Sequence, residues 1–278
     1  MERETRLRET LVAQLERGGI LRSPSVAAAM RAVPRHLFLP MLRAEETYAD
    51  QAIALKVDGD EILSSISQPS MIVQMLQLLE VRPGDRILEV GTGSGYNAAL
   101  LSHLAGPGGS VTSIELDLEM CRRASRTLAE LGYDRIRVLG GDGAADSDGA
   151  PAYDRVAITA RCDDIPSTWW DALSDGGRLV IPLRLPAAGE FAIGFERHGD
   201  RLHGVGAYPC AFIALRGEGA ESAGDRVFFR DASRDVHSPR VRNIASIEAV
   251  RARDATPQLL EDADVVVARP VTMFGIRF

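Results

Sequence analysis

The sequence is poor in the residues that build metal sites and disulfide frameworks. Its 278 residues include only three cysteines and five histidines. The three cysteines are far apart and odd in number, which argues against a C-x-x-C pair or a disulfide framework. The histidines show no close metal-ligand spacing, so the sequence implies no metal. These residues are Cys121, Cys162, Cys210, His36, His103, His198, His203 and His237.

Long apolar runs and an excess of positive charge are also missing. No segment approaches the roughly 18 apolar residues that a membrane-spanning helix needs, and residues 1–9 are too charged for a secretory leader. The formal net charge of −7 disfavours nucleic acid as a partner. With 45% hydrophobic and 26% charged residues, we expect a globular cytoplasmic protein that binds neither membranes nor nucleic acid.

The N-terminal part of the chain reads as helical. Apolar residues at helical spacing predict helices over residues 7–15 and 26–33, and a further helix begins near Pro69. Residues 48–65, between the second and third of these helices, are predicted to be irregular. Within this stretch we expect Lys56, the only lysine of the chain, to lie in a solvent-exposed loop.

From residue 86 onward the pattern alternates between strands and helices. This alternation predicts βαβ units, right-handed crossovers and therefore a doubly wound α/β sheet. A hairpin over 190–197 and 202–208 follows. Of two adjacent tryptophans, Trp169 and Trp170, we expect at most one to face the core. Predicted strands cover 86–90, 110–115, 135–139, 153–159 and 178–183, and predicted helices cover 96–104, 118–131 and 169–173.

A stretch of small, flexible residues at 217–224 predicts a domain boundary. We therefore divide the chain into a domain over 1–216 and a C-terminal extension over 217–278. This appendage could serve as a wall for a bulky peptide, with its arginines meeting an acidic substrate. It could equally consist of extra strands that cover a sheet edge. The arginines are Arg230, Arg234, Arg240 and Arg242.

A glycine-rich loop follows the first predicted strand, where backbone N–H groups are open to a ligand. Its spacing is G-x-G-x-G, and Tyr96 stands where the dinucleotide fingerprint needs a glycine. Glu115 ends the next strand, where a carboxylate can accept from both ribose hydroxyls, and Asp142 follows the third, where it could accept from an adenine amine. The combination favours S-adenosylmethionine, although either acid alone could be a solvated or capping carboxylate.

Five segments together resemble the protein-L-isoaspartate O-methyltransferase family of class I S-adenosylmethionine-dependent methyltransferases. They are residues 34–40 (PRHLFLP), 65–71 (SISQPSM), 88–96 (LEVGTGSGY), 141–143 (GDG) and 175–182 (DGGRLVIP). The resemblance implies a Rossmann-like methyltransferase sheet, S-adenosylmethionine as cofactor with S-adenosylhomocysteine as product, and a peptide or protein substrate.

The resemblance also assigns roles to residues of this chain. It places the functional serine at Ser67, whose alternative role is that of a helix-start residue near Pro69. A substrate carboxylate is already ionised at neutral pH, so the transfer needs no catalytic base. The implied cofactor contacts are Ser65, Ile66, Glu89, Gly91, Gly93, Ser94, Gly95, Glu115, Asp142 and Gly143.

Three hypotheses about function remain open at this point. The altered surroundings of Ser67, the insertion around Lys56 and the long C-terminal extension resemble the branch of the family that modifies ribosomally made peptides. That resemblance implies esterification of an ordinary aspartate in a cyclised peptide, followed by aspartimide formation, and it is our leading hypothesis. The second is repair-type methylation of L-isoaspartyl residues. The third is a non-catalytic adapter that binds the cofactor.

Overall fold

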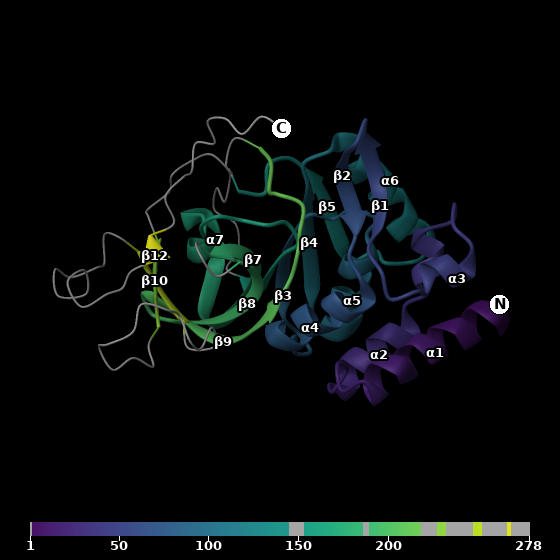
Figure 1. Ribbon diagram of the computed structural model, residues 1–278, viewed down its shortest axis with the longest axis horizontal. Helices are drawn as coiled ribbons and strands as arrows, with labels where there is room; N and C mark the ends of the chain where they lie inside the picture. The colour runs from purple at the N-terminus through teal and green to yellow at the C-terminus, as the bar shows by residue number, and fades with distance from the viewer. Residues whose placement is uncertain are drawn as a thin grey trace.

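The computed structural model is organised around one large β-sheet (Figure 1). It describes residues 2–144, 153–185 and 189–217, together with the backbone of 227–231, 247–251 and 266–267. Within these residues the sheet has ten strands in the order β12-β10-β11-β9-β8-β7-β6-β3-β4-β5. A separate two-stranded hairpin, β1–β2, lies beside α6 and the β4–β5 end of the sheet (Figure 1).

Five neighbouring strands of the sheet run parallel and confirm the predicted doubly wound α/β fold. The hydrophobic runs of the three central strands β3, β6 and β7 are buried on both faces, as expected for strands covered by helices on each side. The predicted strands agree with the five parallel strands within two residues, except that β7 begins five residues before the expected start at 178 and ends two residues beyond 183. The strands are β3 (Arg86–Val90), β4 (Ser110–Glu115), β5 (Ile136–Gly140), β6 (Tyr153–Ile158) and β7 (Leu173–Leu185).

The remaining strands continue the sheet in antiparallel fashion. β8 (Gly189–His198) and β9 (Arg201–Pro209) form the predicted hairpin. β11 (Ile247–Arg251) pairs with β9, and β10 (Val227–Asp231) and β12 (Val266–Val267) follow. The chain beyond residue 217 thus adds strands to the same sheet. The side chains of the four arginines of this extension lie outside the described residues.

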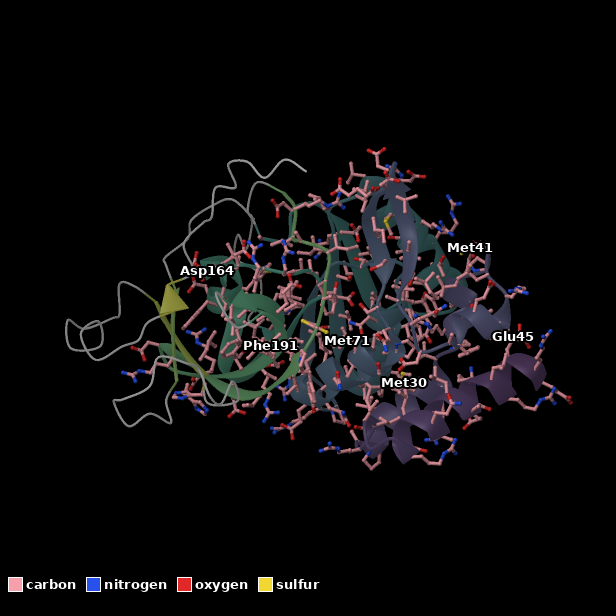
Figure 2. The ribbon with its side chains drawn as sticks, viewed as in Figure 1. Met30, Met41, Glu45, Met71, Asp164 and Phe191 are labelled. Atoms are coloured by element: carbon pink, nitrogen blue, oxygen red, sulfur yellow. The ribbon has the colours of Figure 1, made fainter. Side chains whose placement is uncertain are left out.

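Helices cover both faces of the sheet. The larger core lies between one face and the helices α4 (Pro69–Leu79), α5 (Tyr96–Ala105) and α6 (Leu118–Glu130), with α1 (Glu2–Arg17) and α2 (Pro24–Ala32) packed outside them. Met30 of α2 lies among these side chains and accepts a hydrogen bond from the hydroxyl of Tyr96 at 3.6 Å (Figure 2). The short helices η1 (Arg35–Phe38) and α3 (Ala44–Thr47) connect α2 to β1, and α7 (Ser167–Ala172) packs on the opposite face.

Residues 48–65, which we predicted to be irregular, largely form the β1–β2 hairpin. β1 spans Ile53–Asp58 and β2 spans Glu61–Ile66, with Asp58 paired to Glu61. Gly59, with φ +56°, occupies the first of two loop positions, where a type II′ hairpin turn requires positive φ. The prediction was wrong because these strands are half exposed and lack a regular hydrophobic alternation.

Both tryptophans of α7 are buried, against the expectation that at most one would be. Trp169 and Trp170 are each 1% exposed. The indole N–H of Trp169 donates to the carbonyl of Gly143 at 2.6 Å, and the carbonyl of Trp170 accepts from Arg197 of β8 at 2.9 Å. Adjacent residues lie about 100° apart around a helix axis, so both indoles can reach the core while Asp171 stays exposed.

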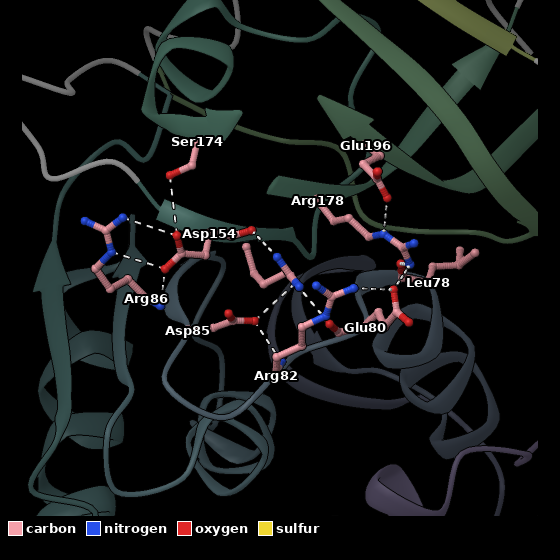
Figure 3. Close-up of polar contacts among 10 residues, drawn as sticks. Leu78, Glu80, Arg82, Asp85, Arg86, Asp154, Ser174, Arg178 and Glu196 are labelled. Atoms are coloured by element: carbon pink, nitrogen blue, oxygen red, sulfur yellow. Dashed lines mark hydrogen bonds and ion pairs between the residues drawn. The ribbon is translucent and has the colours of Figure 1, made fainter. Parts of the chain in front are cut away.

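A network of ion pairs joins the amino ends of β3 and β6 to the end of α4 (Figure 3). Arg86 Nε lies 3.1 Å from Asp154 Oδ2, and Arg178 Nη1 lies 2.7 Å from Glu80 Oε2. Arg155 also belongs to this network, because its Nε lies 3.2 Å from Asp85 Oδ2. These contacts hold the C-terminal end of α4, and the apolar side of α4 lines a cavity described below.

Candidate active site

The glycine-rich loop joins β3 to α5 with three backbone conformations that favour glycine. Gly91, Gly93 and Gly95 have φ angles of +96°, +55° and +87°. A Cβ at Gly91 would lie 2.3 Å from Thr159 Oγ1, so another side chain there would displace its neighbour. The Thr159 hydroxyl lies 2.9 Å from the carbonyl oxygen of Val90 and 2.8 Å from that of Gly91, and therefore holds the start of the loop.

A first cavity opens beside this loop. The free space between its walls, counted out to open solvent, is about 680 Å³. Its walls come from β2, the glycine loop, the end of β4 and the segment 212–216. The lining residues are Leu63, Ser64, Ser65, Val90, Gly91, Gly93, Ile114, Glu115, Leu116, Gly143, Thr159, Ala160 and residues 212–216.

Among the described residues, Glu115 and Arg216 are the two charged side chains that line this cavity. The Glu115 side chain is 8% exposed. Its Oε2 accepts from the Gly93 N–H at 2.9 Å, and its Oε1 accepts from the Asp117 N–H at 3.1 Å. Two backbone donors therefore hold the carboxylate at the cavity, where its remaining lone pairs can accept from hydroxyl groups of a ligand.

Gly143 lines the first cavity, and a Cβ there would meet Val90 Cγ1 at 2.6 Å. Asp142, the preceding residue, lines neither cavity. Asp142 is half-buried and its Oδ1 accepts from the Ala144 N–H at 2.9 Å. Gly217 packs directly on this carboxylate, since a Cβ on Gly217 would sit 2.4 Å from Asp142 Oδ2.

A second cavity adjoins the first, and this one contains Ser67. The two cavities share Ser65, Gly91, Gly93 and Thr159. One wall of the second cavity is apolar and belongs to α4, while Ser67 and the glycine loop supply polar groups. Its lining residues are Ser65, Ile66, Ser67, Ile72, Met75, Leu76, Leu79, Gly91, Thr92, Gly93, Ser94, Asn97, Ala157, Thr159 and Val180.

Glu89 lines neither cavity and lies buried behind the glycine loop. Its carboxylate accepts from Asn97 Nδ2 at 2.8 Å and from the Ser113 hydroxyl. Burial raises the pKa of Glu89 to about 7, and the two hydrogen bonds oppose this shift. The structure thus places Glu89 under the loop, where it links β3 to Asn97 of α5 and Ser113 of β4.

The other predicted site residues come together at the carboxyl ends of the parallel strands. Ser65, Gly91, Gly93, Glu115 and Gly143 line the first cavity. Ser67, Ile66 and Ser94 line the second, while Gly95 lines neither and begins α5 as its N-cap. This is the edge at which open α/β sheets bind ligands.

Sequence reasoning missed two components of the cavity walls. Thr159 follows β6, and a polar residue at a strand end is a signal that could have identified it. The segment 212–216 gave no such signal. It is held at the cavity because Arg161 exchanges backbone hydrogen bonds with Ile213 and Leu215, each at 2.8 Å, and because Arg216 Nη2 donates to the Leu63 carbonyl at 2.8 Å.

The side chains described by the structure include no cluster of three histidine, cysteine, aspartate or glutamate residues that could hold a metal ion. No helix in the same part of the chain is both long and apolar enough to cross a bilayer.

Comparisons with known proteins agree with this arrangement. The model of the family described as Protein-L-isoaspartate(D-aspartate) O-methyltransferase matches residues 5–219. A protein-L-isoaspartate O-methyltransferase of Methanopyrus kandleri is 38% identical over 219 residues, which cover 77% of this chain and 92% of that protein. Protein-L-isoaspartate O-methyltransferase 2 of Shewanella sediminis is 34% identical over 225 residues, covering 81% and 89%.

Solved structures with the same fold include two proteins of this name. A protein-L-isoaspartate O-methyltransferase superposes with a TM-score of 0.68 and 31% identity, covering 76% of this chain and 66% of the other. A second, from Plasmodium falciparum, was solved in complex with S-adenosyl-L-homocysteine. It has a TM-score of 0.66 at 19% identity and covers 75% and 98% of the two chains, which shows a shared fold.

Proposed function

The chain belongs to the protein-L-isoaspartate O-methyltransferase family, and from this premise we propose that it transfers a methyl group from S-adenosylmethionine to the free carboxylate of an L-isoaspartyl residue. One observation carries the proposal. A cavity with Glu115 in its wall adjoins a second cavity that contains Ser67. A cofactor and a peptide carboxylate in these two spaces would meet beside Gly91, Gly93 and Thr159.

The residues of the first cavity fit the nucleoside part of S-adenosylmethionine. The fixed Glu115 carboxylate can accept from the ribose hydroxyls. Gly91 and Gly93 line this cavity with backbone alone, so a ligand can approach the loop closely. When bound, S-adenosylmethionine supplies an electrophilic methyl group on a positively charged sulfur.

The chain's own contribution is to bind, orient and exclude water. Since a carboxylic acid with a pKa near 4 is ionised at neutral pH, no side chain has to remove a proton. Ser67 would donate a hydrogen bond that holds the carboxylate in line with the methyl group, and correct alignment can supply much of the rate. The apolar wall of α4 lowers the local dielectric, which strengthens the attraction between the two opposite charges.

The comparisons favour the repair-type hypothesis over the peptide-tailoring one. The relatives named above are all protein-L-isoaspartate O-methyltransferases, and none is named for ribosomal peptide modification. An adapter without catalysis is disfavoured for the same reason, because these relatives are named as enzymes. Our leading hypothesis from the sequence therefore gives way to the second.

Mass spectrometry with matched peptides tests the proposal. A linear peptide with one L-isoaspartyl residue should gain a methyl group, while the same peptide with ordinary aspartate should not. Ser67→Ala should bind S-adenosylhomocysteine as the wild type does, measured by calorimetry, and turn over much more slowly. Ser102→Ala on α5, away from both cavities, is the control. Methylation of only a pre-cyclised aspartyl peptide would favour the tailoring hypothesis instead.

A further inference from the structure

Arg35 belongs to the proline-arginine motif at 34–40, which the proposed function does not explain. The residue lies in η1 and is 1% exposed. It lines neither cavity. A fully buried guanidinium outside the cavities needs a physical reason, because removing a charge from water is costly.

The contacts of Arg35 join two segments that flank the β1–β2 hairpin. Its Nη2 donates to the carbonyl of Ser67 at 3.0 Å, and its Nε donates to the carbonyl of Thr47 at 3.1 Å. Its guanidinium carbon lies 5.1 Å from the centre of the Tyr96 ring, so the aromatic face also orients it. Thr47 precedes β1 and Ser67 directly follows β2. One side chain thus closes the base of the hairpin and fixes the Ser67 peptide group.

Asp50 supports the same segment from the other side. Its Oδ1 accepts from the Ser70 N–H at 2.8 Å, and its Oδ2 accepts from Gln68 Nε2 at 3.2 Å. Arg35 therefore holds the Ser67 carbonyl. Asp50 holds the side chain of Gln68 and the backbone N–H of Ser70, one and three residues later. These contacts fix the backbone at Ser67 and therefore the direction of its Cα–Cβ bond, from which the hydroxyl extends.

Stability alone does not account for an arginine at this position. Among the residues that the structure describes, no carboxylate lies within ion-pair distance of Arg35, and its Nη1 is buried without a hydrogen-bond partner. Burial lowers the pKa of Arg35, as expected for a desolvated cation. A well-packed apolar residue avoids these costs. What it cannot provide is two donors with fixed spacing for the carbonyls of Thr47 and Ser67.

We propose that Arg35 is a positioning residue for methyl transfer: it holds the Ser67 carbonyl and so directs the Ser67 hydroxyl into the second cavity. This inference rests on the proposed function, since it concerns the serine of that site. It assigns to the proline-arginine motif a role exerted through Ser67, without contact to either reactant.

Arg155 provides a matched control. It is 4% exposed and, like Arg35, donates to two backbone carbonyls, those of Glu80 at 3.1 Å and Asp154 at 2.7 Å. It belongs to the ion-pair network at the amino ends of β3 and β6 and lines neither cavity. Arg35→Lys and Arg155→Lys both keep a charge and lose the planar fork, so both should lower the melting temperature.

Of these two lysine variants, only Arg35→Lys should lose turnover. With an isoaspartyl peptide at a temperature where all variants are folded, we expect kcat of Arg35→Lys to fall about tenfold or more, since small displacements of reacting groups cost that much. The dissociation constant of Arg35→Lys for S-adenosylhomocysteine should stay within about twofold of the wild-type value. The kcat of Arg155→Lys should also stay within about twofold of the wild-type value. If Arg35→Lys does not fold, Arg35→Gln, which retains one donor group, replaces it.

A double variant separates positioning from general damage. If Arg35 acts through Ser67, Arg35→Lys combined with Ser67→Ala should be no slower than Ser67→Ala alone, because interacting residues are not additive. A kcat of Arg35→Lys equal to that of the wild type, or additive losses in the double variant, would overturn the inference. A wild-type protein that methylates no isoaspartyl peptide would instead refute the proposed function.

Discussion

Lys56, on β1, forms an ion pair with Asp117, the residue that caps α6. Asp117 also donates its backbone N–H to Glu115 in the wall of the first cavity. On the opposite side of the hairpin, Arg216 donates to the carbonyl of Leu63 on β2. We predicted Lys56 to lie in an exposed loop, and instead it attaches the hairpin to the cofactor end of the proposed site.

Lys56→Met should weaken cofactor binding modestly. The lysine side chain is 36% exposed, and an ion pair this open to solvent contributes little. The dissociation constant of S-adenosylhomocysteine should therefore rise by no more than about fivefold at low salt, and the difference should shrink at high salt. Calorimetry at two salt concentrations measures both effects. Arg43→Gln, which removes an exposed ion pair with Glu46, should change neither.

Glu115→Gln should weaken cofactor binding strongly. The change removes the charge while it keeps the shape, and hydrogen bonds to charged groups are worth about 1.5–3 kcal/mol. We expect the dissociation constant of S-adenosylhomocysteine to rise about 10- to 100-fold. Glu130→Gln, at the exposed C-terminal end of α6, is the control. Unchanged affinity in Glu115→Gln would remove its role at the ribose.

Gly91→Ala should destabilise the protein more than Gly84→Ala does. The two glycines have similar φ angles of +96° and +92°, so alanine is strained at both by about 1–2 kcal/mol. Only at Gly91 would the new Cβ overlap Thr159 Oγ1, whereas nothing lies within 4 Å at Gly84. Urea unfolding should show a larger loss for Gly91→Ala, which should also lose cofactor binding. Equal losses would contradict the close packing of the loop.

Glu89 should make stability depend on pH. Its pKa is about 7 in the folded protein and near 4.5 when exposed, so the folded state favours the protonated form. This contribution is complete below about pH 4.5 and is lost as the pH rises through about 7. At 1.36 kcal/mol per pKa unit, it amounts to at most about 3 kcal/mol.

Glu89→Gln lacks this titration, so the comparison of the two proteins isolates it. As the pH rises from 5 to 8, the free energy of unfolding of the wild type should fall relative to that of Glu89→Gln. Urea titration at each pH measures this difference. Glu130→Gln at the end of α6 controls for the removal of one negative charge. Parallel pH profiles for wild type and Glu89→Gln would show that Glu89 does not titrate in this range.

Most elements of the sheet could be predicted because their signals are local. Short hydrophobic runs between turns predicted β3, β4 and β6 almost to the residue, and the glycine loop was identified from five consecutive positions. The β1–β2 hairpin was missed because its half-exposed strands show little alternation. Glu89 was placed among the cofactor contacts because it adjoins the loop in sequence, yet strand alternation turns it toward Asn97 and Ser113.

The sequence by itself determined the order of strands and helices, the open backbone of the glycine loop and the placement of Glu115 at a strand end. These follow from hydrophobic period, from glycine's freedom at positive φ and from the rule that parallel strands end at one edge. Only the tertiary structure decided which distant residues enclose the site. The contacts Lys56–Asp117 and Arg216–Leu63 join residues 61 and 153 positions apart. Such pairs depend on how whole elements pack, and no local pattern specifies them.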